Sequence, residues 1–221
     1  VTDEQPSFTI SRMAFTDATG TPRTINGVLG ALEVVDEGAG GVLPHERTTP
    51  KAKTDRLDLT RATRANLSPV WGLSLARGLT DALAAPGEPV GTLTVDGVTH
   101  TVERVTDPAR VAEIAAVVAT DDVLIADGHH RYAIARTYRD QSSDTGMDAA
   151  GATLAFINEL VADQLSVEAI HRVFTGIDPD ALAAALARDF DLSPASTPTP
   201  ATLAEMVDTG RLVLLTHDGA T

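Results

Sequence analysis

Residues 123–131 (VLIADGHHR) form an apolar run that ends in Asp-Gly-His-His-Arg, and this run limits the possible folds more than any other segment. Residues 123–127 are typical of a short buried strand, and residues 129–141 favour a helix. Gly128 between them lets the backbone turn sharply and approach a ligand closely. A strand that passes directly into a helix is typical of α/β architecture, so the sequence predicts a mixed α/β (α+β) fold.

The same segment predicts an anion site. Ligands of open α/β sheets bind at the carboxyl ends of strands, which is where Asp127 would lie. The first N–H groups of the following helix have no partner within the helix, and its dipole favours negative charge. Arg131 adds a planar guanidinium suited to phosphate. The alternative is structural, with Asp127 as a helix cap and His129 and His130 as half-buried filling.

A metal site built from the two histidines is disfavoured. Neighbouring positions on a helix point about 100° apart, so His129 and His130 do not readily share one ion. The chain has no HExxH motif. Magnesium held by carboxylates and phosphate oxygens fits the residues better.

A second polar block, PHERTTPKAKTDR, occupies residues 44–56. Glu46 lies among cationic residues and should stay ionised, which suits a base that removes a proton from a hydroxyl group during phosphoryl transfer. Thr48 can donate to phosphate oxygens, and Lys51 and Lys53 can balance charge. The alternative is the solvated start of a helix with a few ion pairs.

Further polar residues extend this block or stand apart from it. Asn66 and Ser68 either join the site or only turn the chain before Pro69. His171 and Arg172 fall in an apolar segment read as a strand, where a charge needs a phosphate or an acidic partner. Candidate substrate contacts are His45, Arg56, Asn66, Ser68, His171 and Arg172.

Periodicity and turn residues outline the other elements. Asp96-Gly97 marks the tip of a hairpin over residues 91–105, and Pro194 to Pro200 is expected to be a linker. Further strands are expected at 7–16, 25–35, 70–76, 152–160, 169–177 and 211–216. Helices are expected at 51–64, 79–85, 108–119, 179–188 and 200–208.

Composition limits the classes of function. The net charge of −14, from 31 acidic residues against 17 Lys and Arg, argues against long nucleic acids as partners. Cysteine is absent, which excludes thiolate catalysis and fits a reducing compartment. The apolar runs are short and the start has no signal-peptide pattern, so we expect a cytoplasmic protein without a membrane span. The chain starts at Val1 and stops just after an apolar run, and we expect a fragment of a longer protein.

Two long blocks resemble a known family. GVLPHERTTPKAKTDRLDLTRATRANLSPVWGL and IADGHHRYAIA are similar to the signature blocks of the proteins grouped as domain of unknown function 1015, and so is the segment FTISRMAFTD…TINGVLGALEV. The chain departs from the family pattern at Ala133-Ile134, at Gly38–Gly41 and at Glu168–Ile170. Family members are longer.

The resemblance implies a nucleotide-binding core related to the ParB and sulfiredoxin group, over residues 1–150 with blocks at 42–75 and 122–136. Residues 151–221 would begin a C-terminal α/β region. The resemblance also implies a kinase that phosphorylates free L-serine with ATP (or ADP) and Mg²⁺. Asp127 would hold the metal ion, residues 128–131 would hold the phosphates, and Glu46 would take the serine hydroxyl proton.

Two other classes of function stay open from the sequence. One is a nucleotide-binding switch or adaptor without chemistry, which would bind nucleotide without responding to any amino acid. The other is a phosphohydrolase or nuclease, against which the net charge of −14 argues where the substrate is a long nucleic acid.

Overall fold

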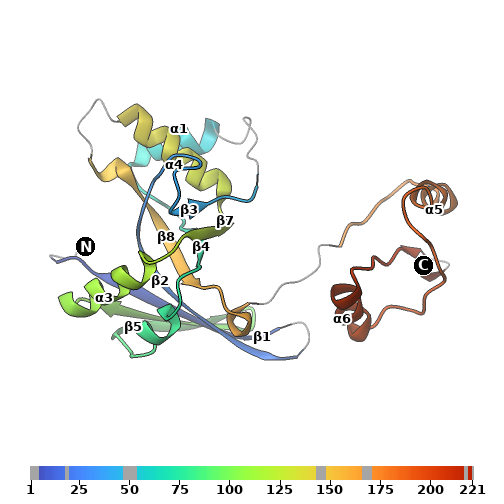
Figure 1. Cartoon of the computed structure of the whole chain (residues 1–221), viewed down its shortest axis with the longest axis horizontal. Helices are drawn as coiled ribbons and strands as arrows, with labels where there is room; N and C mark the ends of the chain where they lie inside the picture. The colour runs from blue at the N-terminus through green and yellow to red at the C-terminus, as the bar shows by residue number, and fades with distance from the viewer. Residues whose placement is uncertain are drawn as a thin grey trace. The chain divides into compact units, whose positions relative to one another are not determined.

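The structure is a computed structural model that describes residues 5–17, 20–46, 54–142, 148–165, 171–216 and 219–220. The chain divides into two compact units (Figure 1). The first comprises Val1–Thr16 with Pro22–Ser166, and the second comprises Asp17–Thr21 with Val167–Thr221. The first unit therefore continues past residue 150 and ends at Ser166.

An eight-stranded mixed sheet forms the centre of the first unit, in the order β3-β7-β4-β8-β2-β1-β6-β5. The pairs β3–β7 and β4–β8 are parallel, whereas the other neighbours are antiparallel. The predicted mixed α/β fold is thus confirmed. The strands are β1 (Phe8–Thr16), β2 (Pro22–Glu33), β3 (Val42–Leu43), β4 (Val70–Ser74), β5 (Glu88–Val95), β6 (Val98–Val105), β7 (Val123–Asp127) and β8 (Ala152–Glu159).

Local sequence explains several of these elements. Asp96 and Gly97 have positive φ angles of 50° and 79°, as the predicted two-residue hairpin turn between β5 and β6 requires. Helix α3 (Pro108–Val118) starts after Asp107, whose side chain accepts a hydrogen bond from Arg110 N. The other helical segments of the unit are α1 (Thr54–Thr63), α2 (Leu79–Ala82), α4 (His129–Ser142), η3 (Asp148–Gly151) and η4 (Ala162–Gln164).

The hydrophobic core lies between the sheet and its helices. Ile114 of α3 and Tyr132 of α4 are buried against strand residues such as Ile125 and Ile157. β8 lies between β4 and β2, so a strand read from the sequence as the start of a C-terminal region is central to this sheet. Among the described residues, all the buried apolar side chains fall between Ile10 and Ile157.

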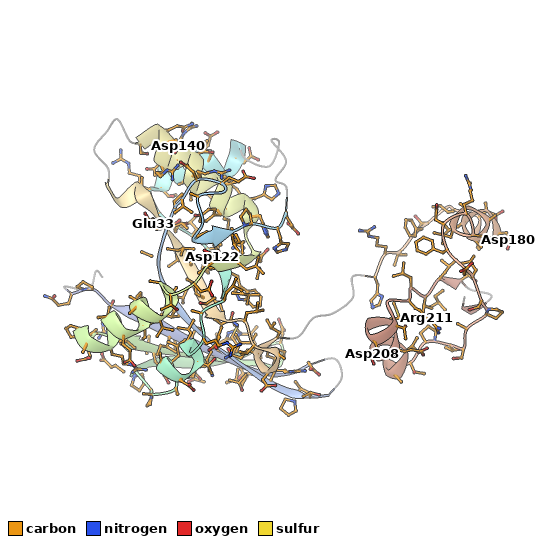
Figure 2. All side chains as sticks on the ribbon, in the orientation of Figure 1. Glu33, Asp122, Asp140, Asp180, Asp208 and Arg211 are labelled. Carbon is orange, nitrogen blue, oxygen red and sulfur yellow. The ribbon has the colours of Figure 1, made fainter. Side chains whose placement is uncertain are left out.

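The second unit contains α5 (Pro179–Leu186), α6 (Pro200–Thr209), β9 (Leu215–Thr216) and β10 (Gly219–Ala220). Within it Arg211 forms an ion pair with Glu205 at 3.3 Å; Arg211 is labelled in Figure 2. The strand predicted at 169–177 is wrong over its described part, residues 171–177, which form no regular element. The strand predicted at 211–216 shortens to β9. Apolar composition alone did not produce a strand at residues 171–177, because a strand also needs a neighbouring strand to pair with.

Candidate functional site

Three segments of the two sequence blocks converge at one edge of the sheet. β3 runs parallel to β7, with Val42 opposite Val123, so the residues that follow both strands emerge at the same edge. β4 runs antiparallel to β7, with Trp71 opposite Asp127. The segment 66–69, which leads into β4, therefore enters at that edge too. The topology brings together blocks that lie about eighty residues apart in the sequence.

The turn from β7 into α4 requires its glycine. Gly128 has a φ angle of +95°, a region that other residues rarely adopt, and a Cβ atom there would lie 2.8 Å from Arg131 Nε. Tyr132 N donates to Gly128 O at 2.9 Å, which is the first i→i−4 bond of α4. The N–H groups of the turn before it have no partner within the helix. The predicted strand-glycine-helix unit is thus present.

Asp127 and Arg131 face each other across this turn. Their side chains form an ion pair. Asp127 is 69% exposed, whereas Arg131 is 25% exposed and folds over Gly128. The guanidinium is therefore already at the helix N-terminus, and the carboxylate stays open to solvent and to ligands.

His129 links α4 to the loop that follows β3. It is buried, its Nε2 accepts a hydrogen bond from the His45 backbone N–H at 3.3 Å, and its Nδ1 lies 3.5 Å from Glu46 Oε2. The two imidazole rings of His45 and His129 meet edge to face at 4.4 Å. Since Nε2 accepts, the neutral ring carries its proton on Nδ1, facing the carboxylate. Burial, followed by the nearby His45, lowers the pKa of His129 below its ordinary value and favours this neutral form.

His130 holds the one buried side-chain nitrogen or oxygen without a hydrogen-bond partner among the described residues, its Nδ1 atom. Such atoms are rare in folded proteins because desolvation without a partner is costly. His130 belongs to the first turn of α4.

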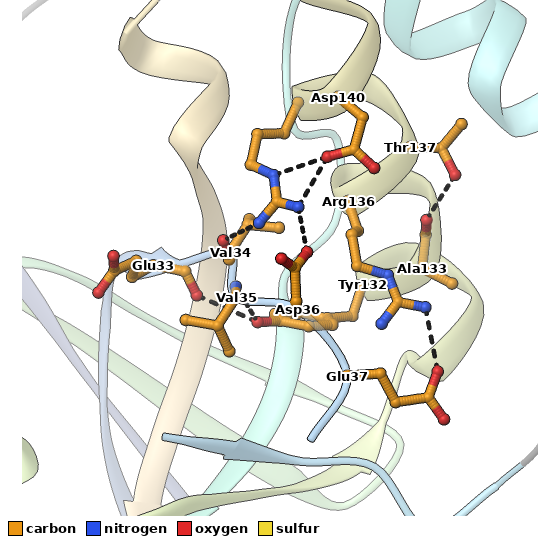
Figure 3. Close-up of polar contacts among 11 residues, drawn as sticks. Glu33, Val34, Val35, Asp36, Glu37, Tyr132, Ala133, Arg136, Thr137 and Asp140 are labelled. Carbon is orange, nitrogen blue, oxygen red and sulfur yellow. Dashed lines mark hydrogen bonds and ion pairs between the residues drawn. The ribbon is translucent and has the colours of Figure 1, made fainter. Parts of the chain in front are cut away.

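A pocket of about 370 Å³ opens beside the His129–Glu46 contact. Its walls come from the loop after β2, from β3 and β7, and from one face of α4, where His129, Tyr132 and Arg136 recur at helical spacing. Figure 3 shows the ion pair between two of the lining residues, Arg136 of α4 and Glu37 of the loop after β2. The lining residues are Val35, Asp36, Glu37, Val42, Pro44, Glu46, Ile125, His129, Tyr132, Ala133 and Arg136.

Arg139 holds one side of the loop that carries Asp36 and Glu37. Its guanidinium donates to Val34 O at 2.6 Å and pairs with Asp36 and Asp140. The hydrogen bond from Arg139 and its charge lower the pKa of Asp36. At the far end of the loop Gly41 N donates to Asp122 Oδ1 at 2.7 Å; Asp122 is labelled in Figure 2.

The other sequence candidates are spread out. Arg56 lies on the exposed α1, and Ser68 is exposed before β4. Asn66 accepts a hydrogen bond from Thr153 Oγ1 at 3.0 Å, which gives it a structural role at the start of β8. His171 and Arg172 are exposed in the second unit, outside any strand, so the apolar strand expected around them is wrong. Thr48, Lys51 and Lys53 lie outside the described residues.

Four polar residues of the pocket were not predicted from the sequence: Asp36, Glu37, Tyr132 and Arg136. A signal for two of them was present, since Tyr132 and Arg136 follow His129 at intervals of three and four residues on one helix face. Asp36 and Glu37 precede the glycine-rich step at 38–41 and showed no pattern of their own.

Within the described part of the chain, no group of three or more His, Cys, Asp or Glu residues is arranged to hold a metal ion. No helix in that part is both long and apolar enough to cross a bilayer. A cation at this edge would take a single carboxylate, that of Asp127, and complete its shell with ligand and water oxygens, as Mg²⁺ commonly does.

The protein is thus a mixed α/β protein with a pocket beside the parallel pair β3–β7 and the N-terminal half of α4. A family model described as "Protein of unknown function (DUF1015)" matches residues 1–220, and the chain belongs to that family. Comparison with curated proteins gave no match, and neither did comparison with solved structures.

Proposed function

We propose that the protein is a small-molecule kinase that transfers the γ-phosphoryl group of ATP to the hydroxyl group of free L-serine. One observation carries this proposal. Glu46 lies 3.5 Å from His129 at the start of α4 and also lines the adjacent pocket. A carboxylate placed between an anion site and a small pocket is the arrangement that a phosphoryl-transfer base requires.

The nucleotide phosphates are assigned to the turn between β7 and α4. The positive φ of Gly128 keeps the space next to the backbone free of a side chain, and the first N–H groups of α4 suit phosphate oxygens. His130, whose buried Nδ1 has no hydrogen-bond partner among the described residues, belongs to the same turn. Arg131 would move from Asp127 to the phosphates and free this carboxylate for Mg²⁺. When bound, the ion neutralises charge that develops on the phosphate oxygens.

Glu46 is assigned the proton of the acceptor hydroxyl group. Its carboxylate takes that proton as the hydroxyl oxygen forms its bond to the γ-phosphorus, and the bond to the leaving ADP oxygen breaks. His129 orients Glu46, because its neutral ring presents N–H from Nδ1 toward the carboxylate while Nε2 is fixed by the backbone of His45. Positioning and charge neutralisation supply most of the rate in such reactions.

Serine as acceptor and the relationship to the ParB and sulfiredoxin group come from the sequence blocks described above. The pocket of about 370 Å³ supports an acceptor of small size. The proposal places the reaction in the cytoplasm, where ATP is made and used. Neither a nucleic acid nor a membrane takes part in it.

The test is phosphoryl transfer by the full chain from ATP with Mg²⁺ to L-serine, L-threonine, ethanolamine, glycerol or water, with products identified by ³¹P NMR. We expect O-phosphoserine from the unaltered chain and a loss of roughly 100-fold or more in Asp127→Ala, where the metal ligand is gone. Glu88→Gln, a change at the exposed end of β5, is the matched control and should keep full activity.

Two other outcomes would contradict the kinase proposal. ATP binding without any phosphorylated product would indicate a nucleotide-binding switch or adaptor. Release of inorganic phosphate at the same rate with and without every acceptor would indicate a phosphohydrolase.

A further inference from the structure

The pocket next to Glu46 carries charges of both signs, and their arrangement identifies a ligand class. Arg136 and Glu37 face each other at its rim, with Arg136 Nη2 3.4 Å from Glu37 Oε2 (Figure 3). We propose that this pocket binds an α-amino acid, with Arg136 holding the ligand carboxylate and Glu37 holding the ligand ammonium group. The inference deepens the proposed function, because it assigns the residues that would select the acceptor.

The contact between Arg136 and Glu37 is one that a ligand can replace. Only one nitrogen of Arg136 contacts one oxygen of Glu37, at 3.4 Å. The Glu37 side chain is 74% exposed and that of Arg136 is 27% exposed. Exposed ion pairs of this kind contribute little to stability. A carboxylate that meets the guanidinium in a paired, two-bond geometry inside the pocket would bind more strongly than Glu37 does.

Arg139 makes a useful contrast on the same helix. Its guanidinium contacts the Val34 carbonyl oxygen and the carboxylates of Asp36 and Asp140, and Arg139 is not among the residues that line the pocket. Arg139 therefore fixes the loop, whereas Arg136 points a cation at the ligand space.

The positions of the groups suit a small hydroxylated amino acid. Arg136 lies seven residues after His129, about 10 Å further along the axis of α4. Long helical side chains lean back toward the helix N-terminus, which shortens the gap between the guanidinium and the His129–Glu46 contact. Apolar residues, among them Val42, Pro44 and Ile125, line the same pocket. A ligand held by Arg136 would extend its side chain toward Glu46.

The charge balance of the lining selects against other ligands. Among the described lining residues there are three carboxylates, those of Asp36, Glu37 and Glu46, and one guanidinium, that of Arg136. Asp36 is already paired with Arg139. A hydroxy acid without an amine would therefore face the carboxylates of Glu37 and Glu46 without an ammonium group to offset them. An amino alcohol without a carboxylate would leave Arg136 paired only with Glu37. A zwitterion satisfies both signs.

The experiment measures binding without nucleotide, so that it does not depend on phosphoryl transfer. Calorimetric titration of the full chain would compare L-serine, ethanolamine and 3-hydroxypropanoate. We expect Arg136→Gln to weaken L-serine roughly 10- to 100-fold, the worth of a lost hydrogen bond between charged groups, and to change ethanolamine by less than about threefold. Glu37→Gln should weaken L-serine and ethanolamine and leave 3-hydroxypropanoate unchanged or tighter.

Arg104→Gln is the matched control, because Arg104 pairs with Glu88 at 2.9 Å on the exposed side of β5 and β6, away from the pocket. It should bind all three compounds like the unaltered chain, and thermal unfolding of each variant checks that it is folded. The amino-acid site is contradicted if the unaltered chain shows no L-serine binding up to about 10 mM. It is also contradicted if Arg136→Gln weakens all three compounds equally.

Failure of this inference can be told apart from failure of the proposed function. Selective L-serine binding without phosphoryl transfer would overturn the kinase and keep the amino-acid site. Phosphoryl transfer to L-serine with an unchanged KM in Arg136→Gln would keep the kinase and overturn the assignment of Arg136.

Discussion

At the scale of single residues, Tyr132 connects the helix of the site to the loop of the pocket. It is buried, its hydroxyl oxygen accepts from Val35 N at 2.9 Å, and its O–H donates to Glu33 O at 3.2 Å (Figure 3). Burial raises the pKa of the phenol, so the donating form persists well above neutral pH. These two hydrogen bonds fix the backbone at the end of β2, and with it the direction in which the loop that carries Asp36 and Glu37 leaves the strand.

Replacing Tyr132 by Phe should lower the free energy of unfolding by about 1–3 kcal/mol, because Val35 N–H and Glu33 C=O each lose a hydrogen bond in a partly buried place. Urea unfolding at pH 7 measures the change. Tyr138→Phe, at the other tyrosine of α4, is the control and should cost less. A loss below about 0.5 kcal/mol in Tyr132→Phe would show that this hydroxyl group does not hold the loop.

Sequence patterns predict interactions between residues that are close in the sequence. They do not predict contacts between residues that are far apart in it. The role of Gly128 could be predicted because a strand, a glycine and a helix are consecutive in the sequence. The ion pair between Arg131 and Asp127 lies within one helical turn, and only its geometry was missing. The contacts of Arg136 and Arg139 with residues 34–37 span about a hundred positions, and nothing local indicates them.

Among the elements, the parallel pair β3–β7 positions the candidate site, and a buried carboxylate at the end of β8 holds the start of α2. Glu159 is buried, its Oε2 accepts from Thr80 N at 2.7 Å, and its Oε1 accepts from Gly78 N at 3.2 Å. Burial by itself raises the pKa of Glu159, but the hydrogen bonds from Thr80 and Gly78 outweigh it and lower the pKa.

Because the pKa of Glu159 is lowered in the folded chain, the free energy of unfolding depends on pH. The unfolded chain takes up a proton at Glu159 near the ordinary value of 4.5, whereas the folded chain takes it up only at lower pH. The contribution of Glu159 is therefore complete above the unfolded pKa and is lost as pH falls through the folded one. Glu159→Gln should cost about 1.5–3 kcal/mol at pH 7.

The cost of Glu159→Gln should shrink below about pH 4.5. Urea unfolding of the unaltered chain and of Glu159→Gln at several pH values between 7 and 3 measures the difference. A difference that stays constant over this range would contradict the assigned pKa direction. Asp96→Asn, at the exposed hairpin tip, is the control for the loss of a carboxylate.

Elements that are specified by neighbouring turn or capping residues could be predicted from the sequence. Elements whose place depends on pairing with a distant strand could not. The hairpin at Asp96-Gly97 and the capped α3 are specified by neighbouring residues. The central place of β8 depends on pairing with β4 and β2, which lie far away in the sequence. The segment 171–177 shows the converse, since apolar composition favoured a strand where the described residues have none.

At the scale of the whole molecule, the two units differ in how much apolar surface they bury. The first contains the whole hydrophobic core of the described residues. In the second, Val173 is 89% exposed, Phe190 is 51% exposed and Leu212 is 73% exposed. A short segment that leaves such side chains in water gains little stability from burial.

A fragment of residues 1–166 should therefore unfold cooperatively, with a thermal midpoint within about 5 °C of that of the full chain. Residues 167–221 alone should show no cooperative transition. Circular dichroism of the two fragments and of the full chain during heating makes the comparison. Cooperative unfolding of the shorter fragment, or its absence in the longer one, would contradict this division of stability.

The role of Glu46 as the base is tested by the rate of phosphoryl transfer in Glu46→Gln. This rate is measured in a single turnover, with the chain saturated by ATP and Mg²⁺ and with L-serine in excess. We predict a rate about 100- to 10,000-fold below that of the unaltered chain, with unchanged affinity for the nucleotide, because only the base is lost. An undiminished rate in Glu46→Gln would show that the carboxylate beside His129 is not the base, and the proposed mechanism would be wrong.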